Sequence, residues 1–173
     1  WPDTHRAPMR PGETLACHGA MTPEPDGCPT WRPRVHVPQT GQMRIAAVQS
    51  APVFLDRSAT VDLVVDRIGQ ASAGGAELIA FPEVFIPGYP VWIDLTNAAA
   101  WEDPDQQAAF SWYLDQAVEV DGPAFAPVIE AVRDSGAFTY VGIVERSASR
   151  GSVYCSLVAI DPVAGVVGVH RKL

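Results

Sequence analysis

The chain has 173 residues and a formal net charge of −8, from 12 Lys and Arg against 20 Asp and Glu. Its 47% hydrophobic and 18% charged content is typical of a globular protein. The acidic balance argues against a nucleic-acid or anionic-membrane partner, and no apolar run approaches the roughly 18 residues of a membrane span. The odd number of cysteines points to a reducing compartment, so we expect a cytoplasmic protein.

Residues 1–42 differ from the rest of the chain. They hold eight of the sixteen prolines and equal numbers of acidic and basic side chains, and they lack apolar periodicity. We interpret this segment as a Pro-rich disordered leader or as sequence that does not belong to the domain. Cys17, His18, Cys28 and His36 lie within it, but their spacing is not that of a zinc module, so we predict no metal.

Order is expected from Met43 onward. Residues 44–49 form a short apolar run that predicts a buried strand, and a helix is predicted over 57–73 because apolar side chains recur at helical spacing. Gly74 is well placed to end that helix. A second buried strand over 77–81 completes a βαβ unit.

Residues 81–90 are punctuated by prolines and predict a loop. Asp103 and Pro104 are typical of an N-cap and first helical position, which predicts a helix to about Val118. A further helix follows Asp121-Gly122-Pro123 and ends near Gly136.

The last part of the chain reads as consecutive strands near 138–145, 152–160 and 166–170, with a turn at 161–165. Alternating strands and helices followed by consecutive strands predict an α/β fold whose sheet is partly antiparallel.

Two charged side chains follow directly on predicted strands. Glu83 comes after the strand over 77–81, and Lys172, the only lysine, comes after the last strand. Functional groups of α/β sheets gather where strands end. A carboxylate and an ammonium there can act as a general base and as a stabiliser of developing negative charge. A solvated surface glutamate and lysine is the plainer interpretation of the same pattern.

The segment around Glu83 is distinctive. Residues 81–92 read FPEVFIPGYPVW, and they closely resemble the glutamate motif of the carbon–nitrogen hydrolase superfamily, most closely its nitrilase and cyanide-hydrating branch. The resemblance covers 43–173, and it includes further segments in the same order and spacing, namely 44–56, 141–146, 153–157 and 170–173.

This resemblance implies an α-β-β-α sandwich of the nitrilase type and a Glu–Lys–Cys catalytic set without a cofactor. Glu83 matches the family's general base, and Lys172 matches the lysine that steadies the charged tetrahedral intermediate. The family's nucleophilic cysteine lies some tens of residues beyond the lysine. We therefore expect 43–173 to be the N-terminal part of the domain, truncated after the strand that carries Lys172 and inactive alone.

The activity that the resemblance implies is conversion of an organic nitrile to a carboxylic acid and ammonia. An aliphatic amidase or a cyanide hydratase is the close alternative, so the expected partner is a small nitrile or amide, with a homo-oligomer when the protein is full length. A non-catalytic α/β assembly module stays open because the nucleophile is missing. A dinucleotide-binding domain is set aside, because no G-x-G-x-x-G follows the first strand.

Other side chains receive structural interpretations. Cys155 lies mid-strand and is expected to be a small buried residue rather than a nucleophile. Glu145 is expected to be a structural acid, and His170 a polar strand end that can also orient Lys172. The remaining candidates are aromatic and either line a substrate pocket or pack in the core, namely Tyr89, Trp92, Trp101 and Trp112.

Overall fold

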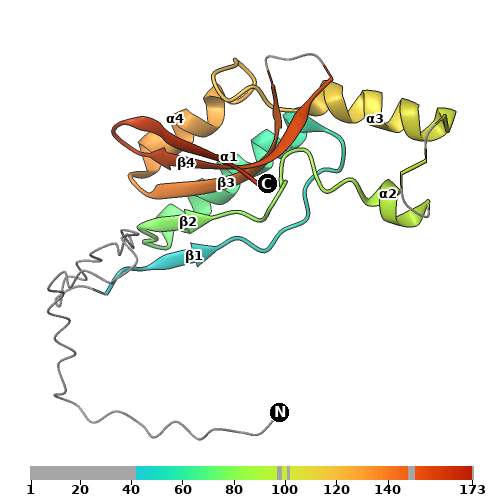
Figure 1. The fold of residues 1–173 in the computed structure, drawn as a ribbon. Coiled ribbons are helices and arrows are strands. Elements are labelled where there is room, and N and C mark those ends of the chain that lie inside the picture. Colours follow the sequence, from blue (N-terminus) through green and yellow to red (C-terminus); the bar gives the residue numbers. More distant parts are fainter. Residues whose placement is uncertain (1–41, 97–98, 101, 148–150, 173) are drawn as a thin grey trace, which may run out of the picture. The chain divides into compact units, whose positions relative to one another are not determined.

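The computed structural model describes residues 42–96, 99–100, 102–147 and 151–172 (Figure 1). Within them, five strands form one sheet in the order β1-β2-β3-β4-β5. The predicted leader lies, apart from Gln42, outside the described residues. None of the helices in the described part of the chain has the length and apolar character that crossing a bilayer requires.

The first half of the sheet is parallel. Strands β1 (Ile45–Ala47) and β2 (Leu78–Ala80) are joined by helix α1 (Arg57–Ala73), as predicted. Asp56 caps the helix by accepting a hydrogen bond from the Ala59 amide, which satisfies one of the free amides of the first turn. Both strands are shorter than predicted, because only three residues of each pair with a neighbour. The prediction that the first strand is buried was wrong, since β1 lies at the edge of the described sheet and Ile45 is largely exposed.

Three helices lie between β2 and the next strand among the residues that the structure describes. Helix α2 (Val91–Leu95) was not predicted; it is five residues long and has no side-chain cap, so it leaves little pattern in the sequence. Helix α3 (Pro104–Gln116) begins after the Asp103 cap, as predicted. Helix α4 (Ala126–Ser135) ends at Gly136, whose φ of 68° is a left-handed conformation that favours glycine.

The second half of the sheet is antiparallel apart from its first pairing. Strand β3 (Phe138–Arg146) pairs parallel to β2 and antiparallel to β4 (Val153–Asp161). Strand β5 (Gly165–Arg171) pairs antiparallel to β4 after a turn in which Asp161 accepts two amide hydrogen bonds. The mixed sheet confirms the predicted α/β class.

The core lies on one face of the sheet. Figure 1 shows α1 and α4 behind the strands, and their apolar side chains pack with those of β2, β3 and β4 in one cluster. The fully buried members include Val64, Ile68, Val128, Val132, Ile79, Val141, Ile143, Val158 and Ile160. Most side chains that alternate with them on the strands are partly buried or exposed, but Val144 is buried in a second, smaller cluster with Val84, Tyr113 and Ala117. The other face of the sheet is therefore covered only in part.

Candidate active site

Glu83 lies in a segment that is attached to β3 on both sides. The Phe81 amide donates to the Tyr140 carbonyl at 2.9 Å, and the Ile86 amide donates to the Gly142 carbonyl at 3.2 Å. The residues between these two bonds leave the regular ladder. Glu83 is therefore held close to the strand while its side chain projects from it.

Gly142 allows this close approach. A Cβ atom at that position would lie 2.1 Å from the Pro82 carbonyl oxygen and 2.8 Å from the Glu83 Cα, distances that no side chain tolerates. Beside Glu83, Val84 has a φ of 44°, a conformation that β-branched residues rarely adopt. The buried Val84 side chain packs with Tyr113, Ala117 and Val144. Its packing holds the strained backbone in place.

The structure brings the two predicted site residues together. Lys172 follows β5, and its amide donates to the Cys155 carbonyl at 2.8 Å, which extends the β4–β5 pairing by one residue. Its Nζ donates to Glu83 Oε1 at 2.9 Å. Both side chains are largely exposed, at 54% for Glu83 and 65% for Lys172. The pair can therefore be reached from solvent.

Cys155 is a third member of this cluster. Its Sγ donates to the same Glu83 Oε1 at 3.1 Å, so one carboxylate oxygen accepts from both the thiol and the ammonium. Sequence reasoning missed this contact, because Cys155 is 72 residues from Glu83 along the chain. The available signal was the strand pleat. Cys155 faces away from the buried Ser156 and thus toward the Glu83 side of the sheet.

The charges in the cluster reinforce one another. The hydrogen bond from Lys172 lowers the pKa of Glu83, and the Cys155 thiol lowers it further. The same contact with Glu83 raises the pKa of Lys172. Burial, and then the neighbouring Glu83 carboxylate, raise the pKa of Cys155 to about 11. Around pH 7 the cluster thus holds a carboxylate, an ammonium and a protonated thiol. Its chemistry is proton acceptance beside a fixed positive charge.

Glu145 lies on the opposite face of the sheet, at the same end. It is 8% exposed and accepts hydrogen bonds from Ser156 and Arg171. The guanidinium lowers the pKa of Glu145 against the opposing effect of burial. The contacts agree with the predicted structural role.

The predicted aromatic candidates lie in different surroundings. Trp92 packs edge-on against the buried Tyr113, with ring centroids 4.9 Å apart, so it belongs to a core cluster. Tyr89 is 53% exposed and is one of the neighbours that raise the pKa of Lys172, so it borders the cluster. Trp112 is exposed on α3, and Trp101 lies outside the described residues.

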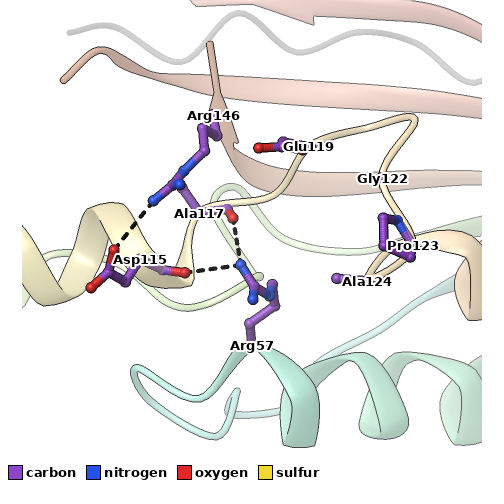
Figure 2. A pocket seen from close by; sticks show the side chains of 8 residues that line it. All are labelled: Arg57, Asp115, Ala117, Glu119, Gly122, Pro123, Ala124 and Arg146. Atoms are coloured by element: carbon purple, nitrogen blue, oxygen red, sulfur yellow. Dashed lines mark hydrogen bonds and ion pairs between the residues drawn. The ribbon is translucent and has the colours of Figure 1, made fainter. Parts of the chain in front are cut away.

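A separate pocket of about 220 Å³ lies at the C-terminal end of α3 (Figure 2). Arg57 Nη1 donates to the carbonyls of Asp115 and Ala117 at 2.9 and 2.8 Å, and Arg146 donates to the Leu114 carbonyl. The last carbonyls of a helix lack partners within it and carry partial negative charge. The two guanidinium groups therefore serve to terminate α3, and the pocket's lining includes no member of the Glu83 cluster.

Metal ligation finds no support among the described residues, where no group of three or more His, Cys, Asp or Glu side chains is placed to hold an ion. The four leader residues considered above for zinc lie outside the described part of the chain.

Several nitrilases are similar in sequence to most of the described residues. The chain is 41% identical over 131 residues to a nitrilase from Pseudomonas syringae pv. syringae, covering 76% of this chain and 37% of that protein. It is 39% identical over 140 residues to an aliphatic nitrilase from Rhodococcus rhodochrous, covering 79% and 36% respectively. The chain thus spans little more than a third of the length of these curated relatives.

Solved structures show the same fold. A mutant of the Nesterenkonia AN1 amidase, from the nitrilase superfamily, aligns with a TM-score of 0.50 and 24% identity, covering 79% of this chain and 45% of that one. Residues 44–173 also match the sequence profile of the carbon-nitrogen hydrolases. With the matching profile, the similar nitrilases and the shared fold, the chain belongs to the carbon-nitrogen hydrolase family.

Proposed function

We propose that this chain supplies the base and the cation of a nitrilase, an enzyme that converts an organic nitrile to a carboxylic acid and ammonia. The observation that carries the proposal is the 2.9 Å contact between Glu83 Oε1 and Lys172 Nζ, two residues 89 positions apart. The names of the similar proteins, which include a nitrilase and an aliphatic nitrilase, support a nitrile substrate.

In this proposal Glu83 is the general base. Its lowered pKa keeps it ionised at neutral pH, so it can accept the proton of an attacking thiol and later that of water. Lys172 provides the fixed positive charge. Attack on the nitrile carbon places negative charge on the substrate nitrogen, and a preorganised ammonium offsets that charge as it develops. Its raised pKa keeps Lys172 protonated for this role.

We do not assign the nucleophile to Cys155, because burial and the Glu83 carboxylate raise its pKa to about 11 and so disfavour the thiolate, which is the attacking form. The family resemblance instead assigns the nucleophile to a cysteine some tens of residues beyond the lysine. We therefore propose that the 173 residues alone do not hydrolyse nitriles.

Other activities of the same family, and a protein without activity, are the alternatives to a nitrilase. An amidase or a cyanide hydratase needs the same base and cation, and a non-catalytic assembly module needs neither. We propose a homo-oligomeric, cytoplasmic enzyme, the location resting on the odd number of cysteines.

Product analysis separates these activities. The 173-residue chain and any longer form that the gene encodes are incubated with aliphatic and aromatic nitriles, the matching amides, and cyanide. A nitrilase releases ammonia and acid from the nitrile, an amidase releases them only from the amide, and a hydratase forms amide without ammonia. We expect acid from the nitrile with a longer form and no turnover by the 173 residues. A Glu83→Gln variant that keeps full activity would overturn the assignment.

A further inference from the structure

The strands that carry the site have a second, different cluster on their other face. Cys155 contacts Glu83, whereas its neighbour Ser156 is buried and donates to Glu145. Lys172 likewise contacts Glu83, whereas its neighbour Arg171 contacts Glu145. Successive side chains of a strand point to opposite faces, so the two clusters lie back to back across the same stretch of backbone.

The Glu145 cluster is tightly bonded. Ser156 Oγ and Arg171 Nε donate to Glu145 Oε2 at 2.6 and 2.9 Å, and Arg171 Nη2 donates to Oε1 at 2.6 Å. Two parallel bonds from one guanidinium to one carboxylate fix direction as well as distance. The Arg171 guanidinium also lies 4.2 Å from the centre of the Tyr154 ring, which restricts it from another side.

We propose that the Glu145–Arg171 pair is a positioning device that fixes the end of β5, so that the Lys172 ammonium stays on the Glu83 carboxylate. The effect of this positioning on catalysis rests on the proposed function, whereas the positioning of Lys172 itself does not. Among the described residues, neither Glu145 nor Arg171 forms a side-chain hydrogen bond with Glu83, Cys155 or Lys172, so both act through the backbone to Lys172.

The need for such a device follows from the topology. In the described sheet β5 is an edge strand that pairs only with β4, and Lys172 lies just past its last residue. Strand ends of this kind fray, because few hydrogen bonds hold them. One residue of slippage moves a side chain by about 3.3 Å and turns it to the other face. The Arg171–Glu145 bonds tie this end across β4 to β3, and they thereby fix which face Lys172 occupies.

The test measures the titration of Lys172, which is the only lysine in the chain. Competitive amine labelling of the 173-residue chain across pH, read by mass spectrometry of the peptide that contains Lys172, reports its pKa. Glu83→Gln removes the carboxylate partner of Lys172, so it gives the full change in the Lys172 pKa that loss of the contact causes. Arg171→Met removes the guanidinium but keeps an apolar stem over Tyr154. Arg67→Met is the matched control, because this arginine on α1 pairs, within the described part of the chain, with its neighbour Asp66 and not with the site.

We expect the Lys172 pKa to fall in Glu83→Gln, to fall by at least about half as much in Arg171→Met, and to stay unchanged in Arg67→Met. The sign is diagnostic. Loss of a neighbouring cation by itself raises the pKa of an ammonium, so a fall in Arg171→Met shows that Nζ has left Glu83. The other groups facing Lys172 are Cys155 and Tyr89, and both are identical in all the variants.

Two results would overturn the proposal. One is an unchanged or raised Lys172 pKa in a folded Arg171→Met chain when Glu83→Gln lowers it, which leaves the proposed function intact. The other is no change in Glu83→Gln itself, which removes the Glu83–Lys172 pair and the proposed function with it. If circular dichroism shows that Arg171→Met does not fold, Arg171→Gln takes its place. That variant also removes a neighbouring cation, so it too must lower the Lys172 pKa, and an unchanged or raised value contradicts the proposal.

Discussion

The two faces of the sheet are built differently. On the face that α1 and α4 cover, Ile143, Val158 and Ile160 are wholly removed from solvent. On the other face, Leu157 is 39% exposed and Phe138 and Tyr140 are partly buried, although they belong to the same strands. The face that α1 and α4 cover holds the larger apolar cluster. The other face is covered only in part, by a smaller cluster around Val144. It carries Glu83, Cys155 and Lys172, and the exposed Glu83 and Lys172 side chains can be reached by reagents and substrates.

This difference shows what keeps the site residues in position. Its members are exposed and their mutual contacts are individually weak in water. Their positions depend on what lies around and behind them: the Gly142 backbone under Glu83, and the Glu145 carboxylate behind Lys172. Changes in the apolar core under α1 and α4 should therefore affect mainly folding, whereas changes at Gly142 or at the Glu145–Arg171 pair should also affect the site.

The largest expected effect separates the two faces directly. Ile143→Ala leaves a cavity in the covered core and should lower the free energy of unfolding by about 2–5 kcal/mol. Leu157→Ala, on the exposed side of β4, should lower it by less than about 1 kcal/mol. Urea denaturation of both variants measures these changes. Equal losses would mean that both faces are equally packed.

Gly142→Ala should have the next largest effect. The added methyl group meets the Pro82 carbonyl and the Glu83 backbone, so the strand or the loop must move. Overpacking of this kind costs about 1–3 kcal/mol, and here it also displaces Glu83. Gly168→Ala is the matched control, because a Cβ there has only one neighbour within 4 Å, at an ordinary contact distance. Similar losses at both glycines would contradict a special role for Gly142.

Acid should weaken the Glu145–Arg171 pair, which holds the end of β5. The pKa of Glu145 is lowered in the folded chain, chiefly by Arg171, so the folded state binds this proton less readily than the unfolded state. That contribution to stability is present above the ordinary pKa near 4.5 and is lost as pH falls through the lowered value. Glu145→Gln should flatten the dependence of the urea midpoint on pH between about 5 and 3. Glu83 and Asp161, whose pKa values are also lowered, leave a residual slope. An unchanged slope in Glu145→Gln would refute this origin.

The smallest effect concerns the Cys155 thiol. With a pKa of about 11, its alkylation by iodoacetamide should still accelerate above pH 9, whereas an ordinary thiol levels off near its pKa. Glu83→Gln removes one negative neighbour and should speed alkylation near pH 8, although burial keeps the pKa raised. Peptide mapping separates this thiol from Cys17 and Cys28. A plateau near pH 8.5 in the unaltered chain would contradict the contact with Glu83.

Much of the fold was predictable from local patterns. Helix α1 was predicted at its observed bounds, because its apolar spacing and the glycine that ends it agree, and the structure adds the Asp56 cap at its start. The Asp103 cap likewise marked the start of α3. Helix α2 was missed, since five residues after several prolines show no period. The sequence predicted a partly antiparallel sheet but not which strands pair, because pairing depends on contacts between distant residues.

The site was only partly predictable. Glu83 and Lys172 were singled out by their positions after strands and by the family resemblance, and the structure places them in contact. The third member of the cluster, Cys155, was expected to be merely a small buried residue. Its approach to Glu83 depends on the loop that Gly142 admits and on the register of β4, which no local pattern encodes.

The central claim is that Glu83 and Lys172 form a pair, and a zero-length cross-link tests it most directly. Carbodiimide joins a carboxylate to an amine only when the two are in contact, and the chain has a single lysine. We predict an amide bond between Lys172 and Glu83, identified by tandem mass spectrometry and absent in Glu83→Gln. Cross-linking of Lys172 to a different carboxylate in the unaltered chain, with none to Glu83, would contradict the pair.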